Sequence, residues 1–140
     1  MKTQTLDTIE TINKIRKSAK AMQQVREITS MAVGEVARQG DIYIERIAKI
    51  ESKGKEVKSR QLAPGTTKGS RHIVSESPKV KLYESKPDLK TRALFQVGPA
   101  IEAKEELIVS HPEHAFIKLP AGTYQVWFQA DFNRKERAKD

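Results

Sequence analysis

The chain contains no cysteine, and its 140 residues include only one tryptophan, three tyrosines and four phenylalanines. The absence of cysteine excludes a disulfide framework and any zinc site with thiolate ligands, and it fits a reducing compartment. No stretch approaches the roughly 18 consecutive apolar residues that a membrane-spanning helix needs. No apolar run follows the lysine near the N-terminus, so we expect neither a secretory signal nor a membrane partner.

The sequence also lacks the patterns that mark common enzymes. It has no nucleophile elbow, phosphate-binding glycine loop or dinucleotide fingerprint, and the Gly65 to Lys68 segment has the wrong spacing for a phosphate loop. Ser110 beside His111 and Glu113 beside His114 are the best acid-base or nucleophile candidates, but neighbours on a strand point to opposite faces. We therefore predict that the protein is not an enzyme and that it needs no cofactor.

Positive charge is abundant, with 26 Lys and Arg against 18 Asp and Glu, a net charge of +8. A positive surface field favours anionic partners. The basic residues are densest between Lys49 and Arg71, a block without aromatic side chains for stacking against bases. This block predicts contacts with nucleic-acid phosphates or with an acidic protein, unless it is simply solvated. The candidate residues are Lys53, Lys55, Lys58, Arg60, Lys68 and Arg71.

Residues 1–33 predict an N-terminal helical arm, because proline is absent and apolar side chains recur every three or four positions. These side chains drift around the helix, so a single flat partner could not cover them all. The helix either wraps on its own domain or forms an arm that contacts neighbouring subunits. The candidate contact residues in the arm are Leu6, Ile9, Ile12, Ile15, Met22, Val25 and Ile28.

Residues 34–132 contain short alternating segments separated by turn residues, which predicts six to eight β-strands. The clearest strands run from Lys79 to Glu84 and from Thr123 to Phe132, and a turn is expected at Gly40-Asp41. Residues 133–140 read as a charged surface tail. The fold class predicted is α+β: a mainly antiparallel small β-barrel or sandwich with an N-terminal helical arm.

The last strand predicts two different faces. Tyr124, Val126 and Phe128 share one face, which we assign to the core. Trp127 lies on the other face between Gln125 and Gln129, where it could anchor a contact with a partner protein.

With no cysteine in the chain, its three histidines are the main candidate metal ligands. His72, His111 and His114 could bind zinc or iron if the chain bends at Pro112, with Glu113 as a further ligand. A histidine pair in a turn more often bonds backbone groups or packs beside a neighbouring strand. We therefore predict no metal site, and keep the three histidines as the alternative.

The order of several short motifs between residues 36 and 132 resembles that of a group of small uncharacterised proteins from bacteria and their phages. The motifs are Arg-Gln-Gly-Asp at 38–41, Leu-Ala-Pro-Gly at 62–65, Gly-Ser-Arg-His at 69–72, His-Pro-Glu-His at 111–114, Leu-Pro-Ala-Gly-Thr-Tyr at 119–124, and Gln129. The usual pattern of the group at 69–72 is Gly-His-x-His, and here Ser70 replaces the first histidine. The resemblance implies a β-rich domain and no established activity.

Together these features predict a structural or assembly protein without catalytic activity. With the phage connection of the resemblance, we expect an auxiliary or decoration component of a phage particle, associated with its capsid and partnered by other protein subunits. Its expected location is the virion, assembled in the host cytoplasm, or alternatively the cytoplasm itself. Two alternatives remain: a sequence-independent nucleic-acid-binding protein, and a metal-binding small β-barrel.

Overall fold

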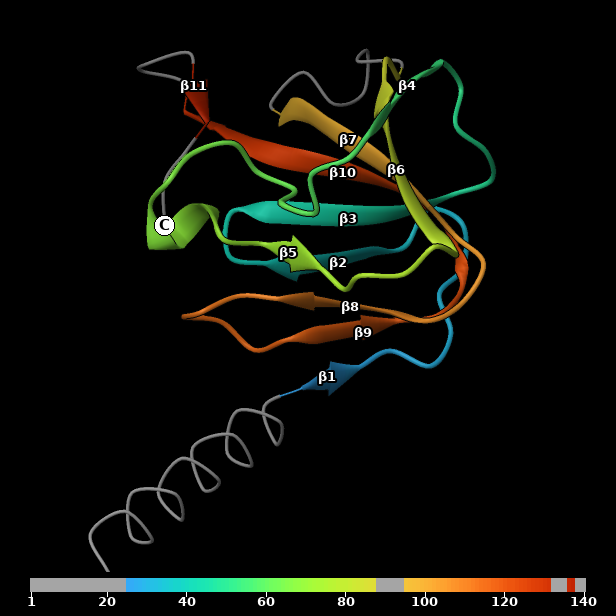
Figure 1. The fold of residues 1–140 in the computed structure, drawn as a ribbon, viewed down its shortest axis with the longest axis horizontal. Coiled ribbons are helices and arrows are strands. Elements are labelled where there is room, and N and C mark those ends of the chain that lie inside the picture. The colour runs from blue at the N-terminus through green and yellow to red at the C-terminus, as the bar shows by residue number, and fades with distance from the viewer. Residues whose placement is uncertain (1–24, 88–94, 132–135, 138–140) are drawn as a thin grey trace, which may run out of the picture.

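In the computed structural model, the described residues are 25–87, 95–131, 136 and 137, and they form two β-sheets (Figure 1). The larger sheet has seven strands in the order β2-β3-β10-β7-β6-β4, with β11 paired to β10. Its strands are β2 (Val36–Gln39), β3 (Ile42–Ile47), β4 (Lys53–Val57), β6 (Val80–Ser85), β7 (Phe95–Ala103), β10 (Gly122–Asp131) and β11 (Glu136–Arg137).

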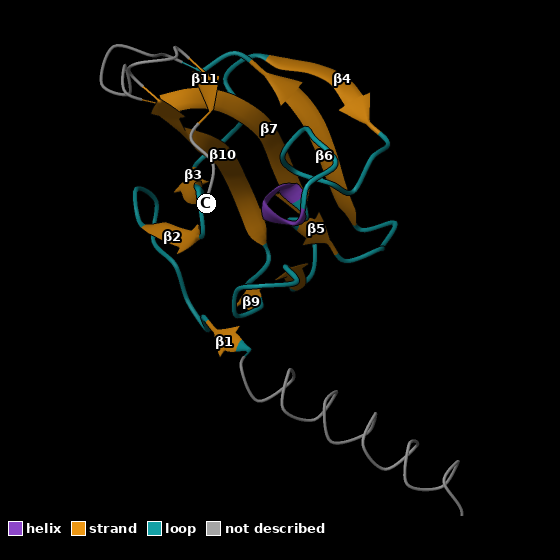
Figure 2. Ribbon diagram, turned by 90° about the vertical axis from the view of Figure 1, so that its left-hand side faces the viewer, coloured by secondary structure: helices purple, strands orange, loops and turns teal. Residues whose placement is uncertain are grey.

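The smaller sheet has four strands in the order β1-β9-β8-β5. Its strands are β1 (Arg26–Glu27), β5 (Ile73–Val74), β8 (Leu107–Ser110) and β9 (Ile117–Leu119). All strand pairs are antiparallel except β1 with β9, which is parallel. Figure 2 shows the small sheet lying across one face of the larger one.

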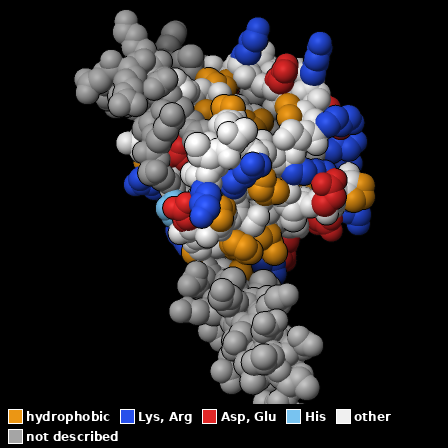
Figure 3. Space-filling model, turned by 60° about the vertical axis from the view of Figure 1, so that its left-hand side comes forward, with side chains coloured by type: hydrophobic (Ala, Val, Ile, Leu, Met, Phe, Trp, Pro, Cys, Tyr) orange, Lys and Arg blue, Asp and Glu red, His pale blue; other side chains and the backbone are white. Residues whose placement is uncertain are grey.

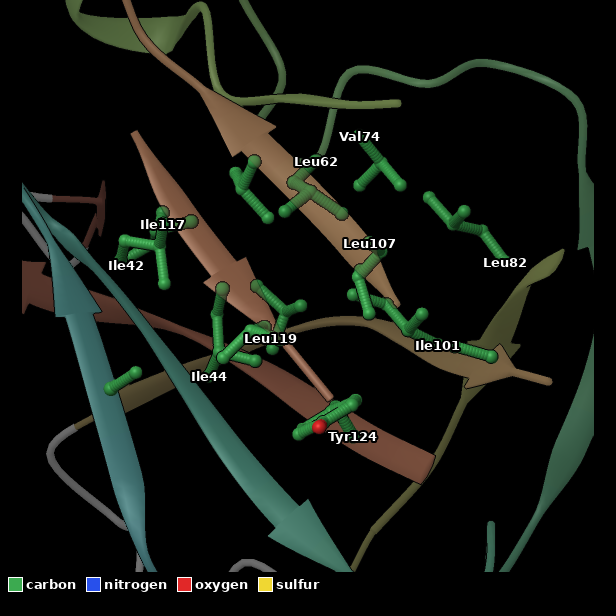
Figure 4. Packing of buried hydrophobic residues seen from close by; sticks show 14 of the residues in the cluster. Ile42, Ile44, Leu62, Val74, Leu82, Ile101, Leu107, Ile117, Leu119 and Tyr124 are labelled. Atoms are coloured by element: carbon green, nitrogen blue, oxygen red, sulfur yellow. The ribbon is translucent and has the colours of Figure 1, made fainter. Parts of the chain in front are cut away.

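The hydrophobic core lies between the two sheets, and its side chains follow the alternation of the strands. Ile42 and Ile44 of β3 and Leu82 of β6 face Leu107 of β8 and Leu119 of β9 (Figure 4). Tyr124 and Val126 of β10 are fully buried on the same face, and Phe128 is 6% exposed, so the predicted core assignment of this strand face is confirmed. Burying each large apolar side chain contributes about 1.5–3 kcal/mol.

The prediction of an α+β fold is wrong, because the described residues are almost entirely β. Their one helical element is the short 3-10 turn η1 (Lys68–Ser70). The two sheets are also open, so the described chain forms two packed layers and not a closed barrel. The β-rich part of the prediction is confirmed, including the Gly40-Asp41 turn that joins β2 and β3.

The helical arm predicted for residues 1–33 is contradicted in its described part. The backbone N–H groups of Arg26 and Ile28 donate to the carbonyls of Phe116 and Lys118, which an α-helix would not allow. Pairing with β9 therefore overrides the local helical pattern. Ile28 packs against the core and Met31 is buried in it, so residues 25–33 belong to the domain. Leu6, Ile9, Ile12, Ile15 and Met22 lie outside the described residues.

Candidate functional site

The three histidines meet at one end of the two layers. His72 directly precedes β5, His111 directly follows β8, and His114 lies in the loop between β8 and β9. The ring centroids of His72 and His111 are 4.4 Å apart, and those of His111 and His114 are 4.5 Å apart. His72 and His111 are buried, whereas His114 is half-buried. The structure therefore places the three predicted candidates together as a stack of tilted rings, with angles of 45° and 41° between neighbouring ring planes.

His72 is held by two hydrogen bonds to residues of the larger sheet. Its Nδ1 lies 2.9 Å from Oε1 of Gln39, and its Nε2 lies 3.0 Å from Oδ1 of Asp41. Both partner atoms are acceptors, because the Nε2 of Gln39 already donates to two carbonyls. The ring of His72 is therefore held between two oxygen atoms of the β2–β3 hairpin. Gln39, His72 and Asp41 are all at most 2% exposed, so the pair is buried.

Gln39 extends this network across the interface between the two sheets. It lies on β2 of the larger sheet, and its Nε2 donates to the carbonyls of Val109 on β8 and Ala115 in the next loop, each at 2.9 Å. Asp41 is further fixed by its carbonyl, which accepts the N–H of Gln129 on β10 at 3.1 Å. The network therefore fastens both sheets at the end where the histidines lie.

His111 is bonded within its own loops. Its Nε2 lies 3.2 Å from the carbonyl oxygen of Gly69, and its Nδ1 accepts the backbone N–H of Glu113 at 3.0 Å. This pattern selects the neutral ring with the proton on Nε2. Burial lowers the pKa of His111 below the ordinary histidine value, and the nearby His72 and His114 lower that pKa further.

The histidine cluster has the geometry of a structural network. All four ring nitrogens of His72 and His111 take part in hydrogen bonds within the chain. Within residues 25–87, 95–131, 136 and 137, no three His, Asp or Glu side chains are arranged to hold a metal ion. The metal-binding alternative would require these bonds to be broken, so we do not carry it forward.

The predicted basic block separates into residues with different roles. Lys53 and Lys55 lie exposed on the edge strand β4, and Lys68 is exposed on η1. Lys58 pairs with Glu56 at 2.5 Å, and this hydrogen bond lowers the pKa of the Glu56 carboxyl. The lysines of the block are close in sequence, but they lie on different elements and one of them is paired with an acidic residue, so they do not form a single positive surface.

The two arginines of the block hold loops in place. The guanidinium of Arg60 donates to the carbonyls of Val80 at 2.6 Å and Ser77 at 2.8 Å. Arg71 donates to the side-chain oxygen of Gln61 at 3.1 Å. The N–H groups of Arg60 therefore bond the segment that leads into β6.

A basic surface that the linear block did not reveal lies on β6 and at the end of β7. Lys79, Lys81 and Lys104 are exposed there around Tyr83 and Glu102, although they come from two separate parts of the sequence. The pairing of Lys81 with Glu102 in the β6–β7 ladder brings the two segments together. Figure 3 shows that Lys and Arg side chains gather on one side of the domain with acidic ones among them.

Trp127 does not present an exposed face to a partner. It is 4% exposed, and its Nε1 donates to Oε1 of Glu45 at 3.0 Å. It lines a cleft of about 450 Å³ together with Val33, Lys49 and Gln125. The Oε1 of buried Gln125 has no hydrogen-bond partner among the described residues. Trp127 therefore links β10 to β3 within the domain. Val25, which was predicted as a contact residue of the arm, lies half-buried before β1.

Exposed apolar side chains lie at the β2 edge of the larger sheet, opposite the edge formed by β4. Within the described residues, the exposed large hydrophobic side chains are Val33, at 63%, and Val36, at 48%. Val36 begins β2, which is the terminal strand of the larger sheet, and Val33 precedes it. This pair was not predicted, because a valine near the start of a short strand has the same local pattern whether it is buried or exposed.

Comparison with known families adds one match. Residues 38–129, about two thirds of the chain, match a family model described as a domain of unknown function (DUF8820). The match runs from β2 to β10 and includes Gln39, Asp41 and the three histidines. No curated protein and no solved structure matches the chain. In the part that the structure describes, no helix is long and apolar enough to cross a membrane.

Proposed function

Because the chain belongs to the DUF8820 family of domains of unknown function, we propose a function from the geometry of the described residues. The protein is a structural subunit without catalytic activity that works in a larger assembly. The observation that carries this proposal is the exposure of Val33 and Val36 beside the open edge of β2. An open edge strand with exposed apolar side chains is a template for pairing with another chain.

The register of the β2–β3 hairpin shows which backbone groups the edge offers. The N–H of Arg46 donates to the carbonyl of Glu35, so the next pair along, Val36 with Glu45, is not hydrogen-bonded. The N–H and C=O groups of Val36 therefore point away from β3, and so do those of Arg38, two residues further on. No other strand among the described residues pairs with this edge.

A second copy of the chain fits this edge by symmetry. If two β2 strands pair antiparallel about Ala37, the outward groups of Val36 meet those of Arg38 in the other copy. This register also keeps the two Arg38 side chains from lying directly opposite each other, where like charges would repel. The exposed valines of both copies would be covered by the same contact.

The absence of free ring nitrogens on His72 and His111 agrees with a role other than catalysis. The assembly that we favour is a phage particle, in which the chain is an auxiliary or decoration component beside the capsid. This version is supported by the resemblance of its motifs to those of small bacterial and phage proteins.

Changing Val33 and Val36 together to lysine should turn the assembled protein into a monomer. Two added charges at the open edge repel a second copy and remove the apolar contact. The measurement is the mass of the full-length protein in solution by light scattering, at moderate and high salt. We expect the wild type to have a multiple of the monomer mass and V33K/V36K to have the monomer mass.

The matched control adds two lysines at exposed positions away from β2, as S52K/T66K. This control should keep the wild-type mass, and circular dichroism should show that both variants are folded. A wild-type protein that is monomeric at every concentration tested would overturn the proposal. So would an oligomer that survives V33K/V36K unchanged.

A further inference from the structure

A hollow of about 430 Å³ opens on the outer face of β6 and the end of β7. It is lined by Pro78, Lys79, Lys81, Tyr83, Glu102 and Lys104. The ladder between β6 and β7 builds it, because Lys81 lies directly opposite Glu102, and Tyr83 follows on the same face. The N–H of Lys104 donates to the carbonyl of Lys79 at 2.9 Å, which brings the third lysine to the rim.

The one carboxylate that lines this hollow is already paired. Glu102 lies 3.2 Å from Nζ of Lys53, a bond that raises the pKa of Lys53, and Lys58 neutralises Glu56 on the neighbouring strand. The Nζ of Lys53 also lies 4.0 Å from the centre of the Tyr83 ring. Lys79, Lys81 and Lys104 form no ion pair with any described residue, and all three are exposed. Three positive charges therefore remain at the rim of the hollow.

We propose that this hollow binds the phosphate backbone of a nucleic acid without reading its sequence. Lys79, in the turn before β6, and Lys81, on β6, line the hollow together with Lys104. A lysine ammonium is a point charge on a flexible stem, so it neutralises phosphates and does not select bases.

The observations favour a nucleic acid over an acidic protein. A protein partner would be expected to cover exposed apolar side chains around the charges. The exposed large hydrophobic side chains of the described residues, Val33 and Val36, lie beside β2, at the other edge of the sheet from β4 and β6. The hollow offers lysines and one half-buried aromatic ring, and this surface is separate from the β2 edge proposed for assembly.

The salt dependence of binding tests the proposal with the full-length protein. Affinities for a labelled DNA duplex, and for its single strand, are measured by fluorescence anisotropy over a range of salt concentrations. Each phosphate contact contributes about 0.9 to the slope of log affinity against log salt for duplex DNA, and about 0.7 for single strands. We expect K79A/K81A/K104A to reduce this slope by about 2–3 and to weaken binding equally for unrelated sequences.

The matched control is K49A/K68A/K86A, which removes three exposed lysines elsewhere and gives the same net charge. Its slope should stay within one contact of the wild type. Equal slopes for the two triple variants would overturn the proposal, since net charge alone would then explain binding. Tighter binding of polyglutamate than of DNA would assign the hollow to an acidic protein instead. Neither result depends on whether V33K/V36K changes the oligomeric state.

Discussion

Replacing His72 with alanine is expected to lower the free energy of unfolding by about 2–6 kcal/mol, because two buried oxygen atoms lose their hydrogen bonds to the ring at about 1–3 kcal/mol each. The change removes the two ring nitrogens that face the Asp41 carboxylate and the Oε1 of Gln39 at 3.0 and 2.9 Å. Both groups are almost completely buried, so water cannot replace the lost bonds without opening the structure. The measurement is urea unfolding followed by circular dichroism at neutral pH.

His114 supplies the matched control for this experiment. It belongs to the same stack of rings but is half-buried, and H114A should cost less than about 1 kcal/mol, as for most partly exposed positions. Both substitutions leave Gly69, Ser70 and the other neighbours of the rings unchanged. If H72A and H114A destabilise the protein equally, the buried network is not what holds this end of the sheets together.

Much of the strand pattern could be predicted from local sequence. Alternation along β6 and β10 identified two central strands, and Gly40-Asp41 identified the hairpin turn. Alternation works there because one face of each strand packs on the core. It fails for β4, whose residues Lys53 to Glu56 are all exposed, because an edge strand without a buried face carries no such signal.

Distant pairing explains the errors in the rest of the fold. Residues near Arg26 have a helical spacing, but their backbone groups bond to β9 across some ninety positions of sequence. β7 continues through Gly98 and Pro99, although glycine and proline weaken a strand locally. There a register shift against β10 lets the strand continue. In both places tertiary hydrogen bonds outweigh local propensity.

The candidate sites were only partly visible in the sequence for the same reason. The three histidines were identified from the sequence, but the two residues that hydrogen-bond His72 were not. These residues, Gln39 and Asp41, lie 33 and 31 positions before His72 and carry no motif for this role. The basic surface around Lys81 joins two segments that meet only through the β6–β7 ladder. A search for charge along the chain selected Arg60 instead, which the fold uses to bond the carbonyl of Val80.

Acidification should destabilise the protein through His111. In the unfolded chain this ring has a pKa of about 6.5, and in the folded chain burial lowers that pKa. Above pH 6.5 the ring is neutral in both states and contributes no pH dependence. Below pH 6.5 the unfolded state binds a proton that the folded state does not, so stability falls as the pH falls, until the folded pKa is passed. The slope from one proton is at most about 1.4 kcal/mol per pH unit.

The position of His111 between two other histidine rings explains why adding a proton to it in the folded state is unfavourable. Protonation of Nδ1 would remove the acceptor for the N–H of Glu113 and would place a cation between His72 and His114, 4.4 and 4.5 Å away. The hydrogen bond to the carbonyl of Gly69 and the carboxylate of Glu113 act to raise the pKa of His111, but burial and the two histidines outweigh them and lower it. We expect urea unfolding at roughly pH 5 to 8 to show the loss of stability, and an NMR titration to give His111 a pKa below 6.5.

His111→Gln separates this effect from other groups that titrate in the same range. Glutamine can still donate to the carbonyl of Gly69, but it takes up no proton, so the H111Q variant should be less pH-dependent than the wild type. H114Q removes the more exposed ring and should retain most of the wild-type slope, because His111 and its burial are unchanged. An unaltered slope in H111Q, or an NMR pKa at or above 6.5, would show that acid acts elsewhere in the network.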